Sequence, residues 1–145
     1  MSHSMNRAER EEFLAGLHVG VLSVDGGGGT PPLTVPVWYT YQPGGVVSVS
    51  TSRDSRKALA IAAAGRFALC AQDERPPYKY VTVTGPAVIE DIDWAERLAI
   101  ARRYLGDEGG HAYMAAAGDG DPGSQVAIRM TPEHWLSADF AKDLS

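Results

Sequence analysis

Short runs rich in valine alternate with segments of glycine and proline along most of this chain, and this alternation constrains the fold most. Residues 18–24 (HVGVLSV) and 33–41 (LTVPVWYTY) are separated by the turn segment DGGGGT at 25–30. Valine and aromatic residues favour strands, whereas glycine supplies the tight turns between them. The 16 glycines and 9 prolines exceed what a helical bundle of this length would use. The pattern predicts strand hairpins, with Pro36 marking an edge strand or a bulge.

Turn signals and hydrophobic periodicity divide the rest of the chain. The expected strands are residues 18–24, 33–41, 46–50, 66–72, 78–90 and 124–130, with a short last one at 135–140. The expected helices run from Asn6 to Gly16, from Ser52 or Asp54 to Ala63, from Asp93 to Gly106 and, as a shorter one, over 108–117. Because the strands cluster in hairpins, the predicted fold class is mainly β with peripheral helices, an antiparallel barrel of about six strands that is closed or partly closed.

Composition and charge exclude several classes of protein. The net charge of −5 argues against a nucleic-acid-binding protein, which should be basic overall. Cys70 is the only cysteine, so a scaffold stapled by disulfides is excluded. No apolar run approaches a membrane span, and residues 1–13 lack the apolar core of a signal peptide. We therefore expect a single cytoplasmic domain over residues 1–145, with residues 1–5 as a disordered or vector-derived start.

The most informative segment is STSRDSRK at 50–57, where a strand ends and a helix begins. Three of the 13 basic residues, Arg53, Arg56 and Lys57, fall within it beside four hydroxyl side chains. Positive side chains in a first helical turn oppose the helix dipole, so their presence needs a reason. Backbone N–H groups, hydroxyls and guanidinium groups together form a site for phosphate or carboxylate. The alternative is a solvated first turn in which Asp54 pairs with a neighbouring cation.

Two further segments are candidates for contact with a ligand. The aromatic run PVWYTY at 36–41 could supply a flat apolar wall beside the basic turn, as a planar ring with a phosphate tail requires. The segment ERPPYKY at 74–80 could form a rim that contacts a polar tail. Ordinary barrel packing for the first and a rigid charged loop for the second are the alternatives.

The sequence offers no catalytic nucleophile and no metal site. The four histidines have no metal-ligand spacing with one another or with Cys70, and the chain has no G-x-S-x-G elbow. Cys70 lies in an apolar strand and is interpreted as an inert thiol. Any redox or transfer chemistry therefore has to come from a bound cofactor.

Four motifs in consistent order carry a family resemblance. They are LTVPVWY at 33–39, VSVSTSRDSRKA at 47–58, RPPYKYVTVTG at 75–85 and IRMTPEHWLSADF at 128–140. This set resembles the pyridoxamine 5′-phosphate oxidase-like split β-barrel proteins, and among them the branch that uses the deazaflavin coenzyme F-420. The resemblance implies an antiparallel six-stranded split β-barrel that forms a homodimer, with two equivalent cofactor sites at the subunit interface.

The resemblance also assigns residues to a cofactor site. The contacts that it implies with the phosphate or tail are Ser50, Thr51, Arg53, Ser55, Arg56 and Lys57. The strand that would line the ring system contributes Val35, Pro36, Val37 and Trp38, with Pro36 and Val37 closest to the ring. The rim would contribute Pro77, Tyr78 and Lys79. No catalytic acid is assigned; Tyr39, Tyr78 and His134 are candidates.

The expected function follows from this resemblance. We expect an oxidoreductase that binds coenzyme F-420 and transfers hydride to a small unsaturated substrate. The deazaflavin's acidic tail requires cations, and Arg56, Lys57 and Lys79 could provide them. FMN in the same site, or a carrier of the cofactor without turnover, are the alternatives. Oxidation of pyridoxamine phosphate is not expected, because Glu133 and His134 follow Arg129 where the family's basic C-terminal motif would stand.

Overall fold

The computed structural model describes residues 3–118 and 123–144. The strands are β1 (Gly20–Val24), β2 (Leu33–Val37), β3 (Val47–Ser52), β4 (Arg66–Asp73), β5 (Lys79–Asp91), β6 (Gln125–Met130) and β7 (His134–Asp139). The helices are α1 (Arg7–Ala15), α2 (Arg56–Ala64), α3 (Trp94–Ala117) and a 3-10 turn over Phe140–Leu144. Each predicted strand is present within about two residues of its expected start, although the second ends at Val37 instead of residue 41.

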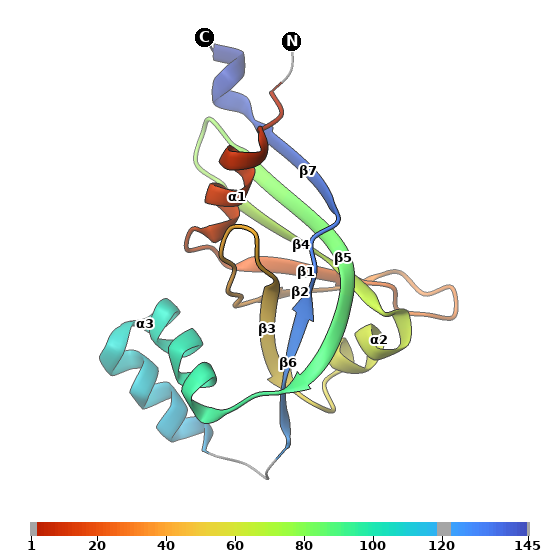
Figure 1. Ribbon diagram of the computed structural model, residues 1–145, viewed down its shortest axis with the longest axis vertical. Coiled ribbons are helices and arrows are strands. Elements are labelled where there is room, and N and C mark those ends of the chain that lie inside the picture. The colour runs from red at the N-terminus through yellow and green to blue at the C-terminus, as the bar shows by residue number, and fades with distance from the viewer. Residues whose placement is uncertain (1–2, 119–122, 145) are drawn as a thin grey trace.

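The strands form one curled antiparallel sheet with the order β2-β1-β4-β5-β6-β3, and β7 pairs with β5 beside this path (Figure 1). The predicted mainly β, six-stranded split barrel is confirmed, with β7 as an addition. The long strand β5 pairs with β4 and β7 over its first half and with β6 over its second half. It bends at Gly85, where a Cβ atom would lie 1.8 Å from the carbonyl oxygen of Thr131. Glycine is therefore required at residue 85, because no side chain fits beside this carbonyl.

The two end strands of the sheet, β2 and β3, meet at a single residue pair among the described residues. Thr40 and Ser48 form an isolated antiparallel bridge, with both backbone N–H···O distances at 3.0 Å. Continuing that antiparallel register would place Trp38 opposite Ser50, but these two residues are not paired. The strands therefore separate next to the bridge, and Pro36 lies on an edge strand as predicted.

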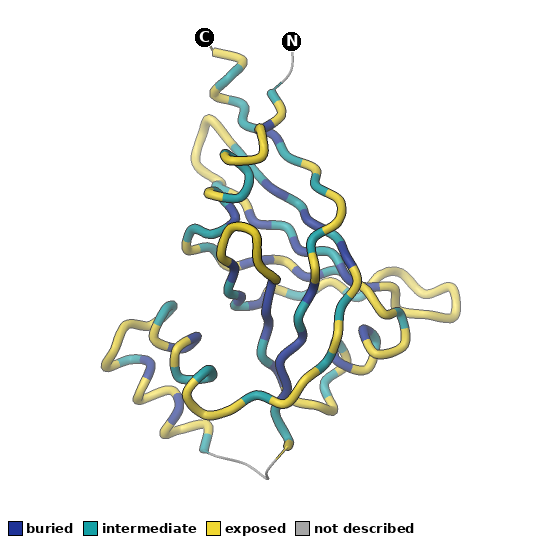
Figure 2. The backbone as a smooth tube through the Cα atoms, viewed as in Figure 1, coloured by how far each residue is buried: buried dark blue, intermediate teal, exposed yellow. Residues whose placement is uncertain are grey.

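The core fills the inside of the barrel. Leu22, Leu69, Val81, Val83 and Ile128 are fully buried, and Figure 2 shows the buried positions gathered along the strands while the connecting loops are exposed. The buried side chains alternate with outward-facing ones along β1, β4 and β5, as expected for a sheet with one face in the core.

The helices begin and end where local signals place them, with one difference. Asn6 and Glu9 form the predicted capping box of α1, and Gly65 ends α2 with a φ of 78°. The N-cap of α2 is Ser55, not Ser52 or Asp54, because the Ser55 hydroxyl accepts a hydrogen bond from Ala58 N at 3.2 Å.

Helix α3 consists of two arms, as the predicted stop at Gly106 requires. Gly106 has a φ of 79°, in the left-handed region that favours glycine. The second arm folds back on the first so closely that a Cβ atom on Gly110 would lie 2.6 Å from Arg102 Cγ. No helix in the described residues is long and apolar enough to cross a membrane.

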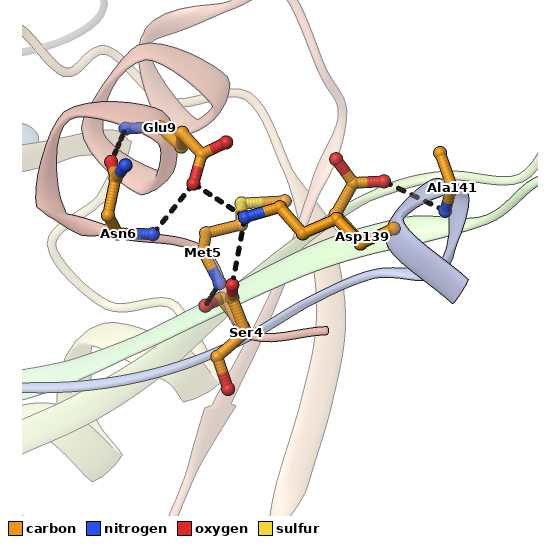
Figure 3. A network of polar contacts seen from close by, with 8 residues as sticks. Ser4, Met5, Asn6, Glu9, Asp139 and Ala141 are labelled. Carbon is orange, nitrogen blue, oxygen red and sulfur yellow. Dashed lines mark hydrogen bonds and ion pairs between the residues drawn. The ribbon is translucent and has the colours of Figure 1, made fainter. Parts of the chain in front are cut away.

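The N-terminal segment packs beside the C-terminal one (Figure 3). Met5 N donates to Ser137 Oγ at 3.1 Å, and Asp139 N donates to the His3 carbonyl at 2.7 Å. The Lys142 ammonium contacts Glu9 Oε1 at 2.7 Å. Of the expected disordered or vector-derived start at 1–5, residues 1–2 lie outside the described residues, while residues 3–5 are held against β7.

Candidate functional site

A groove opens where β2 and β3 separate. Its volume is about 380 Å³, and it is lined by Val19, Pro36, Val37, Trp38, Ser50, Lys57 and Tyr113. Five of these residues come from the two predicted site segments, the aromatic strand and the basic turn. The structure thus brings a flat apolar wall and a cation of α2 to one place, because both segments flank the gap beside the Thr40–Ser48 bridge.

The cations of the first turn of α2 have no partner in the chain as described. Arg56 is exposed and Lys57 is half-buried, and neither makes an ion pair or side-chain hydrogen bond with residues 3–118 or 123–144. Two positive side chains at a helix N-terminus repel the positive end of the helix dipole. An anion bound there would relieve this repulsion, so the local electrostatics favour a negatively charged ligand.

Three other predicted phosphate contacts are engaged inside the protein. The Arg53 guanidinium donates to Asp91 Oδ1 and to the Gly123 carbonyl, and the second distance is 2.7 Å. The carboxylate partner in this region is therefore Asp91 of β5, not Asp54 as in the alternative considered from the sequence. Thr51 is buried, and its hydroxyl donates to Ser55 Oγ at 3.1 Å. These side chains hold the β3–α2 turn in shape.

Helix α3 builds the aromatic side of the groove. The Trp38 and Tyr104 rings stack with centroids 5.1 Å apart and planes at 6°, and Tyr113 lies 5.3 Å from Trp38. The Tyr104 hydroxyl donates to the His18 carbonyl at 2.6 Å and accepts from Tyr39 N at 3.0 Å. These contacts fix Trp38 between the strand and the helix.

Sequence reasoning missed part of the groove and placed one residue differently. Val19 and Tyr113 line the groove but were not singled out, since only the folded-back second arm of α3 brings Tyr113 near Trp38. The predicted helix over 108–117 was the only signal for Tyr113. Val35, by contrast, packs against the core cluster.

The predicted rim residues lie far from this groove within one chain. Figure 1 shows the turn before β5, which carries Pro77, Tyr78 and Lys79, at the end of the molecule near both termini, while the β3–α2 turn is at the other end. Lys79 Nζ lies 5.9 Å from the Phe13 ring centroid. In the same turn, hydrogen bonds from Arg75 lower the pKa of the Asp73 carboxyl to about 2.

A smaller cavity of about 80 Å³ adjoins the groove. Trp38, Ser50 and Tyr113 line both spaces, and the smaller one adds Arg97, Ile100, Ala101, Met114 and Gln125. No Asp, Glu or His lines either space as described. Within the described ranges, no cluster of three or more His, Cys, Asp or Glu residues could hold a metal ion.

None of the three acids considered from the sequence lines the groove. Tyr39 is fully buried, and its hydroxyl donates to the Leu14 carbonyl at 2.6 Å. Burial raises the pKa of Tyr39 well above the ordinary value of a phenol. Tyr78 belongs to the distant turn, and His134 begins β7.

Several solved structures share this fold. A conserved hypothetical protein from Mycobacterium tuberculosis aligns with a TM-score of 0.78 and 21% identity over 100% of this chain and 92% of its own. An F420 reductase aligns with a TM-score of 0.66 and 21% identity over 87% of this chain and 94% of its own. A FAD-binding protein from Mesorhizobium loti aligns with a TM-score of 0.64 and 18% identity over 92% of this chain and 94% of its own.

These likenesses define the class of fold. It is the split barrel of the pyridoxamine 5′-phosphate oxidase-like proteins, as the sequence motifs predicted. No family model matches the sequence, and no curated protein matches it either.

Proposed function

We propose that this protein is an oxidoreductase that binds the deazaflavin coenzyme F-420 in the groove between β2 and β3. The observation that carries the proposal is the Lys57 ammonium, which has no ionic partner in the described chain and lies at the same groove as the Trp38 wall. A planar ring with a phosphate arm needs an apolar wall and a cation side by side. The F420 reductase of the same fold supports this choice of cofactor.

The residues present fit such a group. Pro36, Val37 and Trp38 offer the surface for a tricyclic ring, and Lys57 with the Ser50 hydroxyl offers donors for a phosphate. Arg56, which is exposed in the same helical turn, would hold the acidic tail in this proposal. We assign Thr51, Arg53 and Ser55 a positioning role, because their side chains hold the turn from which these donors project.

The substrate of this proposal is a small unsaturated molecule. When bound in its reduced form, the cofactor supplies a hydride. The chain's own residues, Trp38 and Tyr113 among them, would orient the two reactants in the groove and exclude water from the ring face. No Asp, Glu or His among the described residues lines the groove, and we assign the accompanying proton to water.

Two alternatives use the same groove. FMN has a similar ring and a phosphate arm, and the Mesorhizobium loti protein, described as FAD-binding, shares the fold. A carrier that holds the cofactor without turnover is favoured by the same lack of an acidic side chain along the groove. Both alternatives keep the groove and differ in the ligand or in the chemistry.

We further propose that the protein is a homodimer. Val21, Cys70, Thr82 and Leu136 are cross-strand partners in one row on the outer face of β1, β4, β5 and β7. The row is uncharged, and its ends are exposed, with Val21 at 37% and Leu136 at 62%. Val21 also pairs with Pro36 of the groove. A second copy covering this face would bury it, and only a partner could bring Pro77 to Lys79 to the groove.

The test of the cofactor is a titration of the purified protein with coenzyme F-420 and, separately, with FMN, followed by fluorescence. We expect F-420 to bind more tightly, and Lys57→Ala to weaken binding roughly 10- to 100-fold, as loss of a charge-assisted hydrogen bond does. Arg7→Ala is the matched control, because Arg7 is an exposed arginine of α1 that pairs with Glu11 outside the groove and the rim, and it should leave the affinity unchanged.

Three results discriminate among the proposals. Failure of both cofactors to bind contradicts the proposed function. Tighter binding of FMN supports the flavin alternative instead. Binding without turnover of reduced F-420 in the presence of enones or quinones supports the carrier.

A further inference from the structure

The small cavity beside the groove contains a cation that the cofactor proposal does not use. Arg97 lies in the first arm of α3 and lines this cavity together with Gln125. Lys57 lines the groove but not the cavity. The two spaces share Trp38, Ser50 and Tyr113, so the cavity lies directly beside the groove. The positive charges of Lys57 and Arg97 therefore lie in two neighbouring spaces.

Arg97 differs from the other arginines of α3 in its partners. Arg102 contacts Asp107 at 2.8 Å, and Arg103 donates to the carbonyls of Ala15 and Gly16 at 2.9 Å each. The Arg97 guanidinium makes neither a hydrogen bond nor an ion pair within residues 3–118 and 123–144. Its Cζ lies 5.8 Å from the Trp94 ring centroid, a contact that leaves the N–H donors unused.

The remaining walls of the cavity limit the kind of group that can enter. Ile100, Ala101 and Met114 are apolar, and the Gln125 amide donates to Ser52 Oγ at 3.2 Å. No carboxylate among the described residues lines the cavity, so a cationic group would meet only repulsion from Arg97. A volume of about 80 Å³ admits the end of a molecule, such as a carboxylate on a short stem, but not a ring system.

We propose that the substrate is a conjugated carboxylic acid whose carboxylate binds Arg97. Its unsaturated part would then lie against Trp38 and Tyr113, which line both the cavity and the groove. The inference rests on the proposed function for the reaction, but the carboxylate site itself is a property of the chain. During reduction the carbon–carbon double bond of the substrate gains a hydride from the reduced cofactor and a proton from water, and the carboxylate is unchanged.

The test compares trans-cinnamate with its methyl ester, which has the same conjugated system and no charge. Binding of each probe to the protein without cofactor is measured by calorimetry or by NMR line broadening. The wild type should bind the acid at least 10-fold more tightly than the ester, as a carboxylate–guanidinium pair predicts. Arg97→Ala should abolish this preference and leave ester binding unchanged, while Arg97→Lys should restore part of it. Arg7→Ala, on the exposed side of α1, is the control and should keep the wild-type preference for the acid over the ester.

Each other result overturns the proposal. Equal binding of acid and ester, or no measurable binding of the acid, shows that the cavity does not recognise carboxylates. Weaker binding of coenzyme F-420 to Arg97→Ala shows that Arg97 holds the cofactor's tail instead of the substrate. Because the acid–ester comparison needs no cofactor, a failure of cofactor binding to the wild type contradicts the proposed function without deciding this test.

Discussion

The two ends of the molecule carry basic side chains in different states. Near the termini, Arg75 contacts Asp73 at 3.1 Å and Lys142 contacts Glu9 at 2.7 Å. At the groove end, Lys57 and Arg97 have no carboxylate partner in the described chain. Both ends carried cations at a turn in the sequence, beside hydroxyl side chains at 50–57 and beside tyrosines and prolines at 74–80. The comparison suggests a criterion: clustering of cations identifies a candidate site, and we propose that the cations without an internal carboxylate partner are the ones that bind a ligand.

The largest expected effect concerns the outer sheet face, through which a dimer would bring one copy's terminal end to the other's groove. Leu136→Lys places a charge at the more exposed end of the uncharged row and should convert the dimer into a monomer, because an unpaired buried charge costs several kcal/mol. Sedimentation velocity measures the state. Leu59→Lys on α2 is the matched control, since Leu59 is 59% exposed and lies outside the row.

A wild type that is monomeric at working concentration would contradict the dimer itself. A dimer that survives Leu136→Lys would move the interface to another face. In either case Pro77 to Lys79 of one chain would remain remote from the groove.

The second prediction concerns Tyr39, which ties the two ends together. Its hydroxyl donates to Leu14 of α1 and its backbone N donates to Tyr104 of α3. Tyr39→Phe should lower the unfolding free energy at pH 7 by about 1 kcal/mol, the usual value of one hydrogen bond. Urea unfolding followed by circular dichroism measures the difference.

The pH dependence of this effect follows from the raised pKa of Tyr39. The unfolded chain ionises this phenol near pH 10 while the folded protein keeps it neutral, so its contribution is present below about pH 10 and declines as pH rises above it. The gap between the wild type and Tyr39→Phe should therefore narrow at pH 11. An equal gap at pH 7 and pH 11 would refute the assignment.

The smallest effect is that of Lys142→Ala, which forms a reciprocal pair with Lys57→Ala at the other end. Lys142→Ala should speed hydrogen exchange in α1 and β7, because it removes the contacts with Glu9 and Ser4, and should leave cofactor affinity unchanged. Lys57→Ala should leave hydrogen exchange in α1 and β7 unchanged and should weaken cofactor binding. If both variants weaken cofactor binding equally, the two ends do not differ in the way proposed here.

Local signals account for what could be predicted of the fold. The helix starts and stops depend on backbone effects within one helical turn, so neighbouring residues are enough to predict them. Examples are the Asn6–Glu9 capping box and the glycines at 65 and 106. The Gly85-Pro86 pair was also recognised as a special position in its strand from the two residues alone. The Thr131 carbonyl, which leaves no room for a side chain at residue 85, lies 46 positions further along the chain.

The candidate site could be predicted only in part, because its remaining contacts are not local. Arg53 was grouped with Arg56 and Lys57 from their spacing, but its partner Asp91 lies on another strand, 38 positions away. Tyr113 and Arg97 reach the groove only because α3 turns back at Gly106. No periodicity within either arm identifies the strand residue that it will contact.

The single Thr40–Ser48 bridge has a mechanical consequence for any ligand in the groove. Elsewhere along the sheet path, neighbouring strands are joined over at least three residue pairs, so this seam is where the wall of the barrel resists separation least. Val37 lies on one side of the seam and Ser50 on the other. A molecule that contacts both residues would link the two sides of the seam and oppose their separation.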